Sequence, residues 1–245
     1  MKLRPRLLLL ALSACCSFSA LAMPDTPAEP DPAMAALQEQ ILRIVDMSGL
    51  TGLGIQARHV AQQVLNETNA PLGQQYDVVD RIAPRWAPDQ LQQRLGSLLQ
   101  GYDEVLLQSL QSSFSNRRVV QARNKEQEAI REQGTPAYRE YVQRLRLQPP
   151  PAERLRLIQE LDTAMQFSGL LVETRAAVYP ELQAVLRNWK PADGWQEQVR
   201  REVTEFLLYA HRTTPNDELL RLVDAYREPD LQAWLQTVRQ QLRNS

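Results

Sequence analysis

The chain contains two histidines, His59 and His211, the residue type that most often serves as a general acid or base or as a metal ligand near neutral pH. Neither has the second ligand four residues away that a zinc-binding helix such as His-Glu-x-x-His requires. His59 lies beside an apolar helical stripe, and His211 falls in a last helical turn, where a cation favours the negative helix end. We therefore expect structural roles for both, although distant histidines could still meet a carboxylate in space.

Paired carboxylates are the other pattern with chemical meaning. Asp77 and Asp80 are spaced to share a helix face, whereas Glu126 and Glu128 point to different sides. Glycoside hydrolysis needs two such carboxylates and also an aromatic-lined cleft, and the chain's four tryptophans fit core packing better. The sequence has no glycine-rich phosphate loop, Gly-x-Ser-x-Gly elbow, Ser-x-x-Lys or EF-hand loop. We expect no catalytic residue, no cofactor and no metal ligand.

Charge excludes one class of partner. The chain has 28 basic and 29 acidic residues and a net charge of −1, so it has no general field to attract nucleic acid, and we expect no nucleic-acid partner. Its short basic clusters lie among acids or glutamines at helical spacing, which favours solvated helix faces over sites for phosphates or lipopolysaccharide. These clusters are Arg117-Arg118, Arg144 to Arg146, Arg154 to Arg156 and Arg200-Arg201.

Helices must position these side chains. Leucine, glutamine, alanine and arginine dominate, glycine is scarce, and a 3.6-residue apolar period appears from about Ala33 onward. This predicts an all-α domain over residues 33–245, a multi-helix bundle of amphipathic helices as one body or as two packed helical halves. The predicted helices span about 32–47, 51–66, 74–82, 89–112, 116–133, 136–147, 152–179, 180–189, 194–211, 216–226 and 229–242.

Capping residues and prolines set the predicted boundaries. The range 89–112 has one continuous wide apolar stripe, and 152–179 is expected to be one long helix eased at Gly169. Asn116, Thr135 and Asp193 are expected to cap helix starts, and Pro180 to open a new helix. Residues 148–151 contain three consecutive prolines, which cannot continue a helix, and form a candidate subdomain boundary.

The first 22 residues predict export. Three basic residues precede the apolar run 7–12, and Ala20-Leu21-Ala22 offers a small-x-small cleavage site. We expect a signal peptide over 1–22, cleaved after Ala22, then a flexible proline-rich leader over 23–32. The expected location is the periplasm. No segment of the mature chain is expected to span the membrane.

An alternative route leads to a lipoprotein. Leu12-Ser13-Ala14-Cys15 has the order of a bacterial lipoprotein signal, in which Cys15 becomes the lipidated first residue. Cys16 then follows in place of Asp, which points to the outer membrane. Ordinary cleavage instead removes both cysteines and leaves a mature chain without thiols, so disulfides and thiolate sites are impossible.

The C-terminal stretch 203–242 carries a recognisable order of segments. It has Phe206-Leu-Leu-Tyr209, Thr214-Pro-Asn-Asp-Glu-Leu219, Leu222-Val-Asp-Ala-Tyr226 and Pro229. This region resembles the C-terminal part of the secreted bacterial family called domain of unknown function 2059. Ala225 stands where that family has phenylalanine, and the family's Ser-Pro-x-Gly turn is replaced. The stretch from Ile41 to Leu50, with its Ser48-Gly49-Leu50, is similar to the family's opening helix. The resemblance implies an exported all-α protein and transfers no catalytic residue.

These observations favour a non-catalytic interaction or scaffold protein of the periplasm that binds a protein or another component of the cell envelope. A periplasmic holdase or assembly factor is the alternative, and it would need a broad exposed apolar groove. A hydrolase with a site built from scattered carboxylates and His59 or His211 is less favoured. A closed bundle would favour the scaffold protein, and an exposed apolar groove would favour the holdase. A histidine that meets two buried acids would favour the hydrolase.

Overall fold

The computed structural model describes residues 32–244, so the predicted cleavage site at Ala22 and the predicted lipidation site at Cys15 lie outside the described part. Within that part all regular structure is helical and there is no strand, which confirms the predicted all-α bundle. The helices are α1 (Pro32–Ser48), α2 (Gly52–Glu67), α3 (Leu72–Trp86), α4 (Pro88–Leu99), α5 (Glu104–Ser115), α6 (Arg117–Glu132), α7 (Pro136–Leu147), α8 (Ala152–Met165), α9 (Phe167–Val185), α10 (Trp195–Ala210), α11 (Asn216–Tyr226) and α12 (Pro229–Arg243).

The predicted single helix over 89–112 is wrong, because the chain breaks between α4 and α5. The Asp103 side chain accepts a hydrogen bond from the Leu106 N–H at 2.8 Å and starts α5. Gly101, two residues earlier, favours the break, since glycine is a poor helix former. The apolar stripe is therefore divided between two helices, and Val105 is exposed rather than buried.

The predicted helix over 152–179 is also interrupted. Gln166 adopts the left-handed conformation with φ 53°, three residues before the expected weak point at Gly169. The Asp162 carboxylate accepts hydrogen bonds from the Ser168 N–H at 2.8 Å and its hydroxyl at 2.6 Å, which starts α9. Pro180 lies inside α9 instead of opening a new helix.

Two of the three expected helix caps are present in the structure. Asn116 and Thr135 cap α6 and α7, because their side chains accept hydrogen bonds from Arg118 N–H and Tyr138 N–H. The expected cap at Asp193 is wrong: Gly194 precedes α10 and no side chain caps that helix. The short helix expected over 74–82 is longer than predicted, since α3 runs to Trp86 and includes Pro84.

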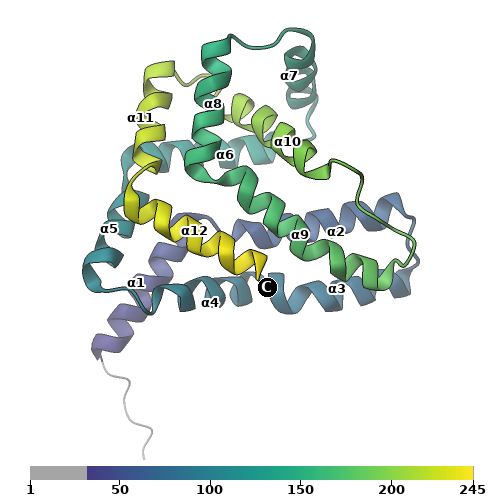
Figure 1. Ribbon diagram of the computed structural model, residues 1–245, viewed down its shortest axis with the longest axis horizontal. Coiled ribbons are helices and arrows are strands. Elements are labelled where there is room, and N and C mark those ends of the chain that lie inside the picture. The colour runs from purple at the N-terminus through teal and green to yellow at the C-terminus, as the bar shows by residue number, and fades with distance from the viewer. Residues whose placement is uncertain (1–31, 245) are drawn as a thin grey trace, which may run out of the picture.

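The helices form two groups, which meet where α9 packs on α8 and α10 and where α5 packs on α6 (Figure 1). In the first group α1 packs on α4 and α5, α9 packs on α2 and α3, and α12 packs on α9 and α5. In the second group α10 packs on α6, α7 and α8, and α11 packs on α8 and α6. The break at Gln166 lets α8 join the second group while α9 joins the first, so this hinge connects the two groups.

The core is apolar throughout both groups and includes Trp86 and Trp234, each at most 1% exposed. Residues 148–151 connect α7 to α8, and both of those helices pack on α10. Among the helices of residues 32–244, none combines the length and apolar character needed to cross a bilayer.

Candidate functional site

A groove runs between α2 and α7 and has apolar side chains of α9 and α10 as its floor. Its volume is about 710 Å³. The Phe167 and Phe206 rings meet edge to face in this floor, with centroids 5.9 Å apart. We call it the α2–α7 groove, and its main lining residues are Gln56 and His59 of α2, Val142 and Arg146 of α7, Phe167 and Leu171 of α9, and Val203 and Phe206 of α10.

A smaller apolar recess of about 180 Å³ lies beside the α2–α7 groove. The two cavities share the lining residues Gln56, Ile130, Phe167, Leu171 and Phe206, so they are adjacent. The recess is lined further by side chains from the first turn of α2 and from α5, α11 and α12, among them Leu53, Phe114, Tyr226 and Leu235. A second apolar space therefore lies next to the floor of the groove.

Ion pairs line the rim of the groove. Arg175 of α9 contacts Glu202 of α10 at 2.7 Å. Arg146 of α7 forms two hydrogen bonds with the Glu205 carboxylate of α10, at 3.1 Å and 3.3 Å, and these raise the pKa of Arg146. Because these acids and bases neutralise one another, the groove combines an apolar floor with a polar rim in which these charges are paired.

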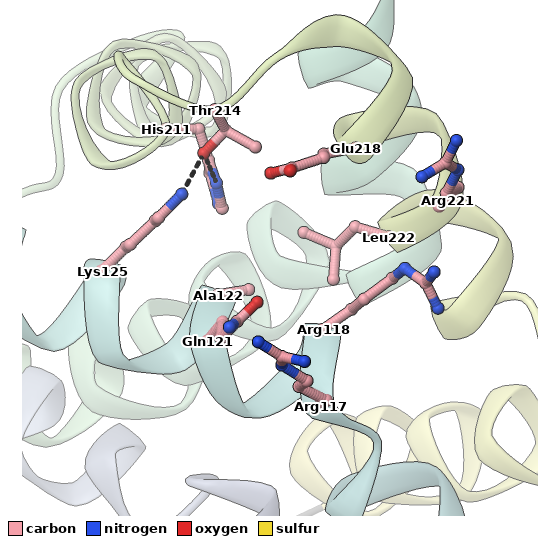
Figure 2. A pocket seen from close by; sticks show the side chains of 10 residues that line it. All are labelled: Arg117, Arg118, Gln121, Ala122, Lys125, His211, Thr214, Glu218, Arg221 and Leu222. Carbon is pink, nitrogen blue, oxygen red and sulfur yellow. Dashed lines mark hydrogen bonds between the residues drawn. The ribbon is translucent and has the colours of Figure 1, made fainter.

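A second, basic cavity of about 330 Å³ lies between α6 and α11 (Figure 2). Arg117, Arg118 and Lys125 line it from α6, and Arg221 and Glu218 line it from α11. The Glu218 carboxylate extends from α11 toward the end of the cavity formed by Thr214 and His211 (Figure 2). We call this cavity the α6–α11 pocket.

Buried polar groups form the inner end of the α6–α11 pocket. His211 is 1% exposed, and its Nδ1 lies 3.4 Å from the Thr214 hydroxyl. The Lys125 ammonium donates a hydrogen bond of 2.7 Å to the same hydroxyl. Arg154 of α8 donates to the carbonyls of Thr214 and His211, and burial lowers the pKa of this arginine. The turn between α10 and α11 is therefore held by side chains from α6 and α8.

Glu126 lies between the apolar recess and the α6–α11 pocket. Its carboxylate lines the apolar recess, and its Oε1 lies 3.5 Å from Nε2 of His211, which lines the α6–α11 pocket. Tyr226, also in the recess, is buried, and burial followed by the nearby Glu126 charge raises the pKa of its hydroxyl. A buried imidazole–carboxylate pair therefore lies between the recess and the α6–α11 pocket.

The two histidines do not meet. His59 is exposed on α2 and lines the α2–α7 groove, whereas His211 is buried at the α6–α11 pocket. The sequence left open that a pair of distant histidines meets a carboxylate in space, but only His211 does so, with Glu126. The 85-residue separation (211 minus 126) explains why sequence spacing could not pair them.

The remaining expected patterns fall at different places. Asp77 and Asp80 line one shallow cavity, as their spacing predicted, but no aromatic side chain lines it. Arg200 pairs with Glu197 on an exposed helix face, as expected of a basic cluster, whereas Arg117 and Arg118 line the α6–α11 pocket. Among the described residues no group of three or more histidine, aspartate or glutamate side chains is arranged to hold a metal ion.

Comparison of the chain with protein-family models, with curated proteins and with solved structures finds no match in any of the three.

Proposed function

We propose that this chain is an exported, non-catalytic binding protein of the cell envelope, and that the α2–α7 groove holds an apolar segment of a protein partner. The observation that carries the proposal is that the groove and the apolar recess are adjacent and share the apolar lining residues Ile130, Phe167, Leu171 and Phe206. Contiguous apolar surface in an open groove marks a site where another molecule is bound.

The size of the recess favours a side chain as its occupant. At about 180 Å³ it is smaller than a pocket for a drug-sized ligand, which starts at roughly 300 Å³. It has room for one large aromatic or aliphatic side chain. The groove outside it, about 710 Å³, then accommodates the neighbouring residues of the same segment.

The polar rim favours a protein segment over an acyl chain. Gln56, Gln63 and Gln143 face the groove, and amide side chains both donate and accept hydrogen bonds. Such groups suit the peptide backbone and polar side chains of an amphipathic segment. A partner helix in a groove of this kind presents apolar anchors at i, i+3 and i+4.

The envelope location rests on the predicted signal over residues 1–22, and the resemblance of residues 203–242 to the domain of unknown function 2059 family agrees with it. The proposal includes two ways of processing the signal sequence: cleavage after Ala22, or lipidation at Cys15. Intact mass spectrometry of the exported protein distinguishes them, because a mature chain that starts at Met23 contradicts lipidation.

The holdase alternative has one observation in its favour, since Ile130 beside the groove is 48% exposed. The defined recess and the paired rim charges favour a more selective binding protein. For the hydrolase alternative, the relevant observation is the His211–Glu126 pair. With 1% of its surface exposed, His211 offers little access to a substrate, and the pair includes one buried carboxylate rather than two.

A displayed library of random peptides tests the proposed groove, with the mature chain as bait. We expect enriched peptides to carry apolar residues at helical spacing and to compete with one another. Ile130→Glu places a charge in the groove and should reduce their binding by at least about tenfold. Ile55→Glu is the matched control, since Ile55 is 60% exposed and lies outside both cavity linings.

Both variants change an exposed residue, so circular dichroism and melting temperature should match the unmodified protein. Enriched peptides that bind Ile130→Glu and Ile55→Glu equally well would contradict the proposed site. Peptides without any apolar pattern would contradict the proposed ligand class.

A further inference from the structure

We propose that the α6–α11 pocket binds a phosphate monoester whose carrier bears a hydroxyl group beside the phosphate. This site is separate from the α2–α7 groove and does not depend on the function proposed for it. The sequence favoured solvated helix faces for all basic clusters, but Arg117 and Arg118 line a cavity that has two further cations and a single acid.

The charge of the pocket lining is locally strongly positive. Four cations, Arg117, Arg118, Lys125 and Arg221, line it together with one acid, Glu218. The whole chain has a net charge of −1, so this concentration is a local feature rather than a consequence of composition. A cavity lined by one sign of charge concentrates counter-ions of the other sign.

Several of these donors are available to a ligand. Within the described chain, no ion pair or side-chain hydrogen bond engages the guanidinium of Arg117 or Arg118. Arg221 pairs with Asp217 at 3.4 Å on an exposed surface, where ion pairs contribute little. The Lys125 ammonium has three donors and gives one to Thr214. Guanidinium groups match phosphate oxygens with two parallel hydrogen bonds each.

The pocket is held in shape before any ligand arrives. Ala122 and Leu222 form its buried apolar wall, and both are at most 3% exposed. Arg154 fixes the turn that carries His211 and Thr214 through hydrogen bonds to two carbonyls and to the Asn216 side chain. A preorganised turn reduces the ordering cost of binding.

Glu218 narrows the ligand class. A carboxylate inside a basic pocket repels a bare anion but accepts a hydrogen bond from a hydroxyl group on the ligand. Figure 2 shows this carboxylate on the α11 side, between the arginines and the Thr214 end. A ligand with its phosphate among Arg117, Arg118 and Arg221 would therefore place its carrier's hydroxyl group near Glu218. The volume of about 330 Å³ suits a phosphorylated polyol or monosaccharide.

Titration calorimetry at low ionic strength tests this inference with glucose 6-phosphate and inorganic phosphate as probes. We expect glucose 6-phosphate to bind more tightly than inorganic phosphate. Arg118→Gln and Arg117→Gln should each weaken glucose 6-phosphate binding about tenfold. Arg131→Gln on the same helix is the matched control, because it removes the same charge outside the pocket and should leave binding unchanged.

Glu218→Gln tests recognition of the carrier's hydroxyl group separately from recognition of the phosphate. Removal of the repelling charge should strengthen binding of inorganic phosphate and reduce the preference for glucose 6-phosphate. Co-sedimentation with phosphatidylcholine vesicles, with and without lipid A, distinguishes a lipid-borne phosphorylated sugar from a soluble one, and binding in either form supports the site.

Each variant changes an exposed residue, so melting temperatures serve as the fold control. No binding of glucose 6-phosphate at millimolar concentration, together with no binding to lipid A vesicles, would overturn the inference. Equal binding by the Arg117→Gln/Arg118→Gln double variant and by Arg131→Gln would overturn it as well. Stronger binding of inorganic phosphate than of glucose 6-phosphate by the unmodified chain would overturn the role given to Glu218.

Discussion

At the scale of single residues, Glu126 has an unusual position because its carboxylate borders an apolar recess on one side and a buried imidazole on the other. The distance of 3.5 Å to His211 Nε2 is within ion-pair range but longer than an ordinary hydrogen bond. Neither Oε1 of Glu126 nor Nε2 of His211 has another hydrogen-bond partner. Each of these two atoms therefore depends on the other for compensation of its burial.

Because only His211 belongs to this pair, substitution of the two histidines should lower the free energy of unfolding by different amounts. His211→Ala should lower the free energy of unfolding by about 2–4 kcal/mol, because it leaves the Glu126 carboxylate buried without a partner and opens a cavity. Glu126→Gln keeps the shape and an acceptor, so its cost should be smaller. Urea unfolding followed by circular dichroism measures both.

His59→Ala is the matched control for His211→Ala. His59 is exposed, and exposed substitutions usually change stability by less than about 0.5 kcal/mol. Equal costs for the two histidine variants would contradict the structural role given to the His211–Glu126 pair.

At the scale of elements, short side-chain caps decide where helices begin. Asp103 starts α5 and Asp162 starts α9, in both cases inside a stretch that reads as one helix. The break before α9 affects the candidate site, because it places α8 and α9 in different groups of helices. The floor of the α2–α7 groove lies where those groups meet.

Alanine substitution of the capping aspartates, Asp103 and Asp162, should show how much these caps stabilise the fold. Asp103→Ala and Asp162→Ala should each lower the free energy of unfolding by about 0.5–2 kcal/mol, since a backbone N–H at the helix start loses its acceptor. Asp193→Ala is the control, because Asp193 precedes an uncapped helix start and should change stability by less than about 0.5 kcal/mol. A cost at Asp193 equal to that at Asp103 would contradict this assignment of caps.

The same caps show how far the sequence predicts this fold. Apolar periodicity identifies the helical class and most helices, because burial of one face gives a 3.6-residue pattern. It does not locate the breaks at Asp103 and Gln166, since the apolar stripe continues across each break while the chain direction changes. The Glu126–His211 pair cannot be predicted from apolar periodicity either, because only the packing of α10 on α6 brings those residues together.

At the scale of the whole molecule, tyrosines connect helices that are distant in sequence. Tyr138 and Tyr141 of α7 pack edge to face on Tyr209 of α10, with centroids 4.7 Å and 5.1 Å apart. Tyr209 donates a hydrogen bond of 2.7 Å to Glu132, and this bond is the main cause of its raised pKa. Burial is the main cause of the raised pKa of Tyr138, Tyr141 and Tyr226.

These shifts predict a loss of stability at alkaline pH. In the unfolded chain tyrosine ionises near pH 10. The folded protein holds its tyrosine protons to higher pH, so the stability that depends on the neutral hydroxyls is fully present below about pH 10. Above that pH the unfolded state binds fewer protons than the folded state, and the free energy of unfolding falls as pH rises.

Tyr226 should contribute most to this slope, because it is 5% exposed and its pKa is raised the furthest. For Tyr226→Phe we expect a smaller loss of stability between pH 9 and pH 11 than for the unmodified protein, by about 1 kcal/mol at the upper end. Tyr76→Phe is the control, since Tyr76 is 68% exposed, and it should follow the unmodified protein. Urea unfolding at half-unit pH intervals measures the slopes, and parallel curves for Tyr226→Phe and the unmodified protein would show that burial of this hydroxyl does not govern alkaline unfolding.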